Sequence, residues 1–100
     1  MEGDWETQRF IFSGFEWDYE KATKNDRKHK VSFEDAAKIF AREVVYRQDL
    51  DSSEERYIAL GFADTSFLAV VFAERSENIR IISARRATAA ERRWYGTHIS

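Results

Sequence analysis

Three apolar segments in the second half of this 100-residue chain are separated by short polar turns, and this pattern constrains the fold more than any other feature. The segments cover residues 55–63, 67–75 and 79–84, and the turns cover residues 64–66 and 76–78. Short runs rich in β-branched and aromatic residues, bounded by such turns, are typical of strands. Because short turns join antiparallel neighbours, we expect a β-meander.

Helices and shorter strands are expected in the first half of the chain. Asp18 is a favourable N-cap for a polar helix over residues 19–29. A second helix begins near Ser32, and the helical spacing of its apolar residues predicts that it packs on the sheet. Short strands are expected over residues 9–12 and 44–47.

The C-terminal segment has a clear helix signal. Thr88 and Glu91 have the spacing of a capping box, which predicts a helix from that point to about Tyr95, with Gly96 as its stop. The fold class expected is α+β: a small single domain with an antiparallel β-meander sheet, two N-terminal helices packed on it and a C-terminal helix. The strands are apolar on both faces, so both should be covered, by helices or by a partner protein.

Composition excludes several classes of protein. The chain has no cysteine, so a disulfide framework and a thiolate metal site are both excluded. No apolar run approaches the roughly 20 residues of a membrane span. The first residues are acidic and polar, unlike a signal peptide, so we expect a cytoplasmic protein without membrane contact.

Charge is distributed unevenly along the chain. Residues 1–55 hold nine Lys and Arg and fourteen Asp and Glu, 9 − 14 = −5, whereas residues 56–100 hold seven and four, 7 − 4 = +3. All seven basic residues of the second half are arginine. Arginine suits forked contacts to phosphate or carboxylate, although drift in a small sample is the alternative explanation.

The expected hairpins bring three of these charges together. With Phe62 opposite Leu68 in the first hairpin, Arg56 lies opposite Glu74. With Glu74 opposite Arg80 in the second, all three charged side chains form one row on one face. The row is either a salt-bridge ladder at the rim of the sheet or a site for a phosphodiester, in which arginines hold the phosphate and a carboxylate handles a proton.

Histidine offers one further candidate. His29 lies at the expected end of a helix beside Lys28 and Lys30, where it either interacts with the helix dipole or serves as an acid or base near neutral pH. The only other histidine, His98, is far away in sequence, so no metal site and no cofactor are expected. The phosphate-loop, dinucleotide-binding and hydrolase-elbow motifs do not occur.

Two blocks of the sequence resemble the BrnT family, the toxin half of a bacterial type II toxin–antitoxin pair. The first has the pattern FEWD…K…N…KH.V.FE from Phe15, and the second has R.ISAR.AT..ER..Y from Arg80. The resemblance covers about residues 15–95, so the expected division is an N-terminal extension with a possible edge strand over residues 1–14 and a toxin domain over residues 15–97.

The resemblance implies a fold similar to that of RelE toxins and metal-independent ribonuclease activity. It also implies a hetero-oligomer with BrnA, an antitoxin with a ribbon-helix-helix domain, so that DNA is bound only through the antitoxin and the complex represses its own operon. The polar family positions map onto a set of residues in this chain: Lys28, His29, Arg56, Arg80, Arg85 and Tyr95.

The hypothesis from the sequence is therefore RNA cleavage by attack of the 2′-hydroxyl on the adjacent phosphate. Its catalytic candidates are Arg56, Arg80 and Arg85 for phosphate charge, with Glu74 or His29 as base. Its RNA-binding candidates are Lys21, Lys28, Arg86 and Tyr95. The alternative is a non-catalytic module that binds a partner protein through its sheet face and arginines, while direct DNA binding is less favoured because no recognition-helix pattern is visible.

Two departures from the family pattern bear on these expectations. Lys30 replaces the glycine that usually follows the histidine, and it costs about 1 kcal/mol if the helix ends there in a left-handed conformation. Tyr19 replaces the proline that often follows the aspartate of FEWD, a residue that suits the first helical position without being required there.

Overall fold

The computed structural model describes residues 5–99, and over this range it contains one six-stranded sheet and three α-helices, which confirms the α+β class. In chain order the elements are β1 (Glu6–Gln8), β2 (Gly14–Glu16), α1 (Tyr19–His29), α2 (Phe33–Lys38) with a 3-10 turn (Ile39–Ala41), β3 (Val44–Gln48), β4 (Tyr57–Ala63), β5 (Ser66–Arg75), β6 (Asn78–Arg86) and α3 (Ala89–His98).

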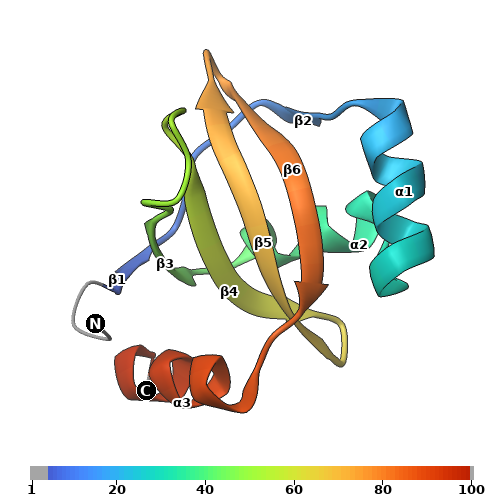
Figure 1. The fold of residues 1–100 in the computed structure, drawn as a ribbon. Helices are drawn as coiled ribbons and strands as arrows, with labels where there is room; N and C mark the ends of the chain where they lie inside the picture. Colours follow the sequence, from blue (N-terminus) through green and yellow to red (C-terminus); the bar gives the residue numbers. More distant parts are fainter. Residues whose placement is uncertain (1–4, 100) are drawn as a thin grey trace.

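The sheet is mixed, so the expectation of a purely antiparallel meander is wrong. Its strand order is β1-β3-β4-β5-β6-β2 (Figure 1). Strands β3 to β6 form an antiparallel meander, and β1 adds to β3 in the same sense. β2 instead pairs in parallel with β6, because the N-terminal segment crosses from one edge of the sheet to the other before α1 begins.

Both hairpins of the meander are one residue tighter than the sequence suggested. Each turn contains two residues, and the first of them, Asp64 or Ser76, has a left-handed φ of 56° or 54°. The shorter turns shift the register, so that Arg80 lies opposite Ala73. Because side chains alternate along a strand, Glu74 points to the other face, and the expected row of Arg56, Glu74 and Arg80 does not form.

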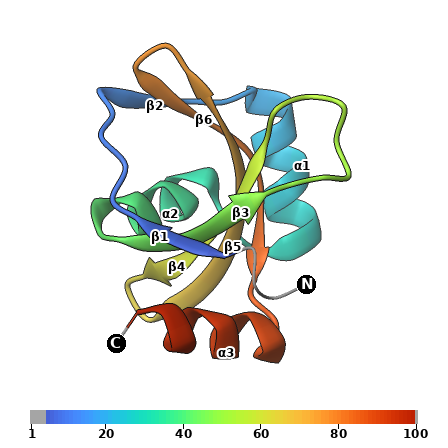
Figure 2. The same ribbon diagram turned by 90° about the vertical axis from the view of Figure 1, so that its left-hand side faces the viewer.

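Apolar layers lie on both faces of the sheet. On one face, α2 and its 3-10 turn bury Phe33 and Phe40 against Phe72 of β5. On the other face, Trp94 of α3 belongs to a smaller cluster with Leu60 and Phe67. Figure 2 shows α2 on one side of the sheet and the β3–β4 loop on the opposite side. α3 crosses only one end of its face, so the rest of that face is left for polar side chains (Figure 1).

The N-terminal segment differs from the expectation in where its strands lie. Residues 9–12 form no strand; they connect β1 to β2 and bury Phe10 in the core. Trp5 is also buried and stacks on Trp94, with ring centroids 5.4 Å apart. Residues 1–4 lie outside the described range, and the division into an extension over 1–14 and a domain over 15–97 stays a prediction.

The helix ends follow their sequence signals with one exception. Asp18 accepts hydrogen bonds from the backbone N–H groups of Glu20 and Lys21, and the capping box at Thr88 forms in full. Lys30 ends α1 with φ 60° and ψ 35°, the left-handed conformation that glycine adopts most easily. The stop expected at Gly96 is wrong, because α3 continues to His98.

Candidate active site

Four arginines share the face of the sheet that α3 only partly covers. Register defines this face: Arg47 pairs with Ile58, Arg80 with Ala73, and Arg85 with Ala69, which is buried under α3. Arg56 lies two residues before Ile58, so the alternation of strand side chains directs it the same way. We call this surface the arginine face and define it by a set of four residues: Arg47, Arg56, Arg80 and Arg85.

A β-bulge brings Arg80 and Arg85 to the same face. Residues five apart in a regular strand point to opposite faces. Here the β5–β6 register shifts between Val71 and Phe72, so that Ile82 has no partner of its own in β5. The extra residue reverses the alternation beyond it, as bulges do. Both arginines therefore point away from α2, which simple counting along the strand would not predict.

Arg80 has a carboxylate partner that the sequence did not indicate. The parallel pairing of β2 with β6 places Glu16 beside Arg80, and their Oε1 and Nη1 atoms lie 3.3 Å apart. Asn78 donates to the second carboxylate oxygen of Glu16 at 3.3 Å. The Arg80 side chain retains 28% of its exposure and Glu16 retains 36%, so solvent and a ligand can reach both. The result is a cation and a carboxylate held side by side on an open surface.

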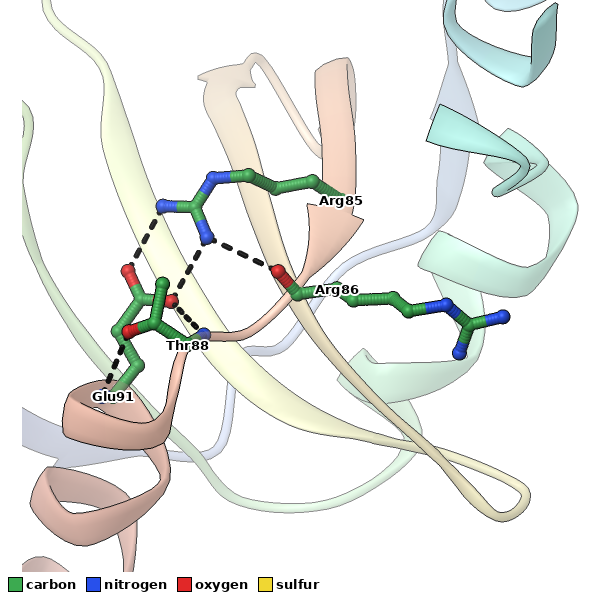
Figure 3. Close-up of polar contacts among 4 residues, drawn as sticks. All are labelled: Arg85, Arg86, Thr88 and Glu91. Atoms are coloured by element: carbon green, nitrogen blue, oxygen red, sulfur yellow. Dashed lines mark hydrogen bonds and ion pairs between the residues drawn. The ribbon is translucent and has the colours of Figure 1, made fainter. Parts of the chain in front are cut away.

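Arg85 is held much more tightly than Arg80. Its two terminal nitrogens donate to the two carboxylate oxygens of Glu91, each at 2.9 Å, and one also donates to the carbonyl of Arg86 (Figure 3). Burial raises the pKa of Glu91, but hydrogen bonds from Arg85 and Thr88 outweigh that effect, so the pKa is lowered overall. The hydrogen bond to Glu91 raises the pKa of Arg85. This bidentate pair fastens α3 to the end of β6, which favours a positioning role for Arg85.

Arg86 points away from this pair. Figure 3 shows its side chain leaving the strand in the direction opposite to that of Arg85. Arg86 pairs with Leu68, which is buried in the core on the α2 side of the sheet. Its guanidinium is exposed, so it can contact a ligand only beyond the end of the sheet, not on the arginine face.

Arg56 and Arg47 occupy the other side of the arginine face. Arg56 contacts Glu54 at 3.4 Å, and among the described residues its buried Nε has no hydrogen-bond partner. The guanidinium carbon of Arg47 lies 4.8 Å from the centroid of the Trp5 ring, a cation–π contact. The indole therefore holds the Arg47 cation against the arginine face, and no ion pair among residues 5–99 neutralises it.

A stripe of lysines on α1 adjoins the arginine face. One flank of α1 lines a shallow cavity with Phe33 and Glu34 of α2, and its residues there are Tyr19, Ala22, Thr23 and Asp26. At about 100° per residue, Lys21, Lys24 and Lys28 lie roughly opposite that flank, on the side away from α2. All three are exposed, and no ion pair among residues 5–99 includes them.

Electrostatics links this lysine stripe to Arg80. The hydrogen bond from the Lys21 backbone N–H, together with the charges of Lys21 and Arg80, lowers the pKa of Asp18. Both cations therefore lie near one carboxylate at the start of α1. Of the sequence-derived candidates, Lys21 therefore lies near Arg80, and Lys28 lies two turns further along the same side of α1.

Two other candidates lie away from the arginine face, and a third is packed between α3 and the sheet. Glu74 is on the opposite face, where its charge contributes to raising the pKa values of Tyr46 and Tyr57. His29 ends α1, and no hydrogen bond or ion pair among residues 5–99 joins it to the arginine face. Tyr95 packs in an aromatic cluster, with its ring centroid 4.9 Å from that of Phe67.

Asn25 belongs to the family pattern but received no role from the sequence; in the structure it positions the lysine stripe. Its side-chain amide donates to the carbonyls of Val31 and Ala84 at 3.0 and 2.9 Å and accepts from the Ala84 N–H at 3.1 Å. The bonds to Ala84 pair backbone groups of β6 that lie beyond the end of β2, and they fasten α1 to this edge of the sheet. The available signal was an asparagine inside a polar helix, where its propensity is poor.

Metal-ligand clusters and membrane-spanning helices are both absent from the described residues. Within residues 5–99, no group of three or more His, Asp or Glu side chains is arranged to hold a metal ion. No helix of the described chain is long and apolar enough to cross a membrane.

Comparison with known proteins gives one family match. A family model described as the ribonuclease toxin BrnT of a type II toxin–antitoxin system matches residues 17–91. That span includes α1, the whole β3–β6 meander and the start of α3. The search of curated proteins found no match.

Proposed function

This chain belongs to the BrnT family of type II ribonuclease toxins, and from that premise we propose that it is an endoribonuclease whose active site is the arginine face beside Arg80. One observation carries the proposal: Arg80 and Glu16 stand together on an open sheet face, with the lysine stripe of α1 alongside. Attack of a 2′-hydroxyl on RNA needs a base near the hydroxyl and positive charge at the phosphate, and this pair can supply both.

The proposed reaction proceeds without a metal ion. The Glu16 carboxylate takes the proton from the ribose 2′-hydroxyl as the 2′-oxygen forms a bond to the adjacent phosphorus. The bond from phosphorus to the 5′-oxygen breaks, and that oxygen takes a proton from Lys21 or from solvent. Arg80 stabilises the negative charge that gathers on the phosphoryl oxygens, an interaction whose removal typically costs about 100–1,000-fold in rate.

This assignment changes the role given to several residues by sequence. Glu16 replaces Glu74 and His29 as the proposed base, because it is the carboxylate in contact with Arg80. Arg56, on the same face, remains a candidate for stabilising the negative charge of the phosphate. Lys21 and Lys28 are proposed to hold the RNA backbone.

The net charge of −2 does not oppose RNA binding at this surface. Affinity for phosphate depends on the local positive charge that displaces counterions. The lysine stripe supplies three exposed cations that form no ion pair within the described range. Binding should therefore weaken steeply as salt concentration rises.

Membership of a toxin–antitoxin family implies an antitoxin partner. We propose that this partner is BrnA-like, with a ribbon-helix-helix domain that binds DNA. The hetero-oligomer would lie in the cytoplasm and repress its own operon. We also propose a RelE-like arrangement of the fold. The antiparallel β3–β6 meander, with helices before and after it, supports that comparison.

A second function, binding of a partner protein without catalysis, is favoured by one observation. Arg80, Arg85 and Arg56 each already contact a carboxylate, so their charge is partly neutralised. Such a face could dock a protein that exchanges these ion pairs for its own. This function predicts tight complex formation and no RNA cleavage at any protein concentration.

Cleavage of a labelled single-stranded RNA by the purified chain tests the proposal. The wild type, Arg80→Ala and Glu16→Gln are compared at matched concentration in the presence of a metal chelator. Arg42→Ala is the matched control, because Arg42 is exposed beyond the 3-10 turn and outside the arginine face. Loss of at least 100-fold in rate with either site variant and none with the control supports the proposal. Equal rates in all four proteins would reject the assignment.

A further inference from the structure

A cavity of about 420 Å³ lies on the arginine face between the β3–β4 loop and the start of α3. Its size falls within the roughly 300–1,000 Å³ of small-molecule sites. Ile58 of β4 lines it, and so do Arg47 and Arg85. β4 is separated from β6 by one strand, so Ile58 is about 10 Å across the sheet from the strand that carries Arg80.

The cavity lining combines flat cations with free carboxylates. Arg47 rests on Trp5 and has no ion-pair partner among the described residues. Asp49 and Asp51 line the cavity from the loop, and neither is part of an ion pair within residues 5–99. One oxygen of Asp49 accepts the N–H of Asp51 at 3.2 Å in a local turn, which leaves the other oxygen available.

We propose that this cavity is a nucleobase subsite that prefers guanine, an inference that rests on the proposed ribonuclease function. Bases of single-stranded RNA are commonly held by stacking on flat side chains and by hydrogen bonds to their edges. Ile58 provides an apolar surface for the ring, and Arg47 provides a planar one. The subsite would accept a base a nucleotide or two from the phosphate at Arg80.

The preference for guanine follows from donors and acceptors. A carboxylate has two acceptor oxygens and no donor. Guanine presents two donors side by side, N1–H and N2–H, and its O6 and N7 accept from an arginine. Adenine and cytosine place a ring-nitrogen acceptor where guanine has N1–H, and this acceptor would face a carboxylate oxygen. Uracil offers one donor between two carbonyls.

Binding of nucleoside monophosphates to the full chain tests the inference without any cleavage. GMP, AMP, CMP and UMP are titrated separately, and dissociation constants are measured by NMR or calorimetry. Two parallel hydrogen bonds between a side chain and a base favour the correct base over a wrong one by about tenfold or more. GMP should therefore bind at least tenfold more tightly than AMP or CMP. Equal affinities for all four nucleotides would overturn the inference.

Exchanging a carboxylate for an amide should move the preference. In Asp51→Asn and Asp49→Asn, one acceptor becomes a donor, which matches the Watson–Crick edge of adenine. At least one of these variants should lose the tenfold GMP preference and gain affinity for AMP. Glu34→Gln is the matched control, since Glu34 is an exposed carboxylate on α2 and lies outside the cavity. Unchanged selectivity in both loop variants, with circular dichroism confirming their fold, would overturn the inference.

RNA cleavage by the same preparation separates this inference from the proposed function. Cleavage without any GMP preference rejects the guanine subsite and retains the nuclease. A GMP preference without cleavage retains the subsite as a nucleotide site and rejects the nuclease.

Discussion

Among alanine substitutions on α1, Asn25→Ala should destabilise the fold most. Asn25 is only 8% exposed, and its amide makes three hydrogen bonds, two of them to the backbone of Ala84. Each such bond contributes about 1 kcal/mol net, and the substitution leaves their buried backbone partners unsatisfied. The expected loss is therefore about 3 kcal/mol, a large share of the roughly 5–15 kcal/mol that stabilises a domain.

Urea unfolding, followed by tryptophan fluorescence and circular dichroism, measures this loss. A domain of this size should also lose roughly 15 °C in melting temperature. Thr23→Ala is the matched control, because Thr23 is exposed on the same helix. The amide hydrogen of Ala84 should exchange faster with solvent in Asn25→Ala. Substitutions at neutral surface sites change the free energy of unfolding by about 0.5 kcal/mol or less. A loss this small in Asn25→Ala, with the Ala84 amide still protected from exchange, would refute the reasoning.

Three further predictions follow from individual contacts. Lys30→Gly should stabilise the fold by about 1 kcal/mol in urea unfolding, because Lys30 has a left-handed φ of 60°; no gain would show that the strain is relieved elsewhere. Glu91→Gln should destabilise the fold at neutral pH. Because the pKa of Glu91 is lowered in the folded state, protonation removes its stabilisation, and the difference in unfolding free energy from wild type should shrink as pH falls below about 4.5. A difference that is independent of pH would contradict this. Glu16→Gln should keep the melting temperature within a few degrees of wild type yet lose cleavage, and a cleaving, folded variant would remove Glu16 as the base.

The elements of this fold that sequence could predict are those with local signals. Asp18 and Thr88 mark helix starts because their side chains satisfy the first free N–H groups of a helix, which depends only on neighbouring residues. The β3–β6 meander follows from apolar runs and short turns. The left-handed Lys30 was likewise foreseeable from the glycine that the family pattern has there.

The register and the site depend on contacts between distant residues, and sequence could not fix them. A turn of two residues rather than three moved Glu74 to the opposite face from Arg80. The bulge near Val71 then brought Arg85 to the same face as Arg80. The parallel pairing that brings Glu16 to Arg80 joins residues 64 apart in the chain, and no local pattern signals it.

Induction of this chain alone in a bacterium, with growth and RNA integrity followed together, tests the central claim most directly. The wild type, Arg80→Ala and the Arg42→Ala control are induced to equal levels of soluble protein. We expect the wild type and Arg42→Ala to arrest growth with loss of intact RNA, while cells that produce Arg80→Ala grow normally. Growth arrest with RNA loss in cells that produce folded Arg80→Ala would contradict the claim that Arg80 lies at the centre of the active site.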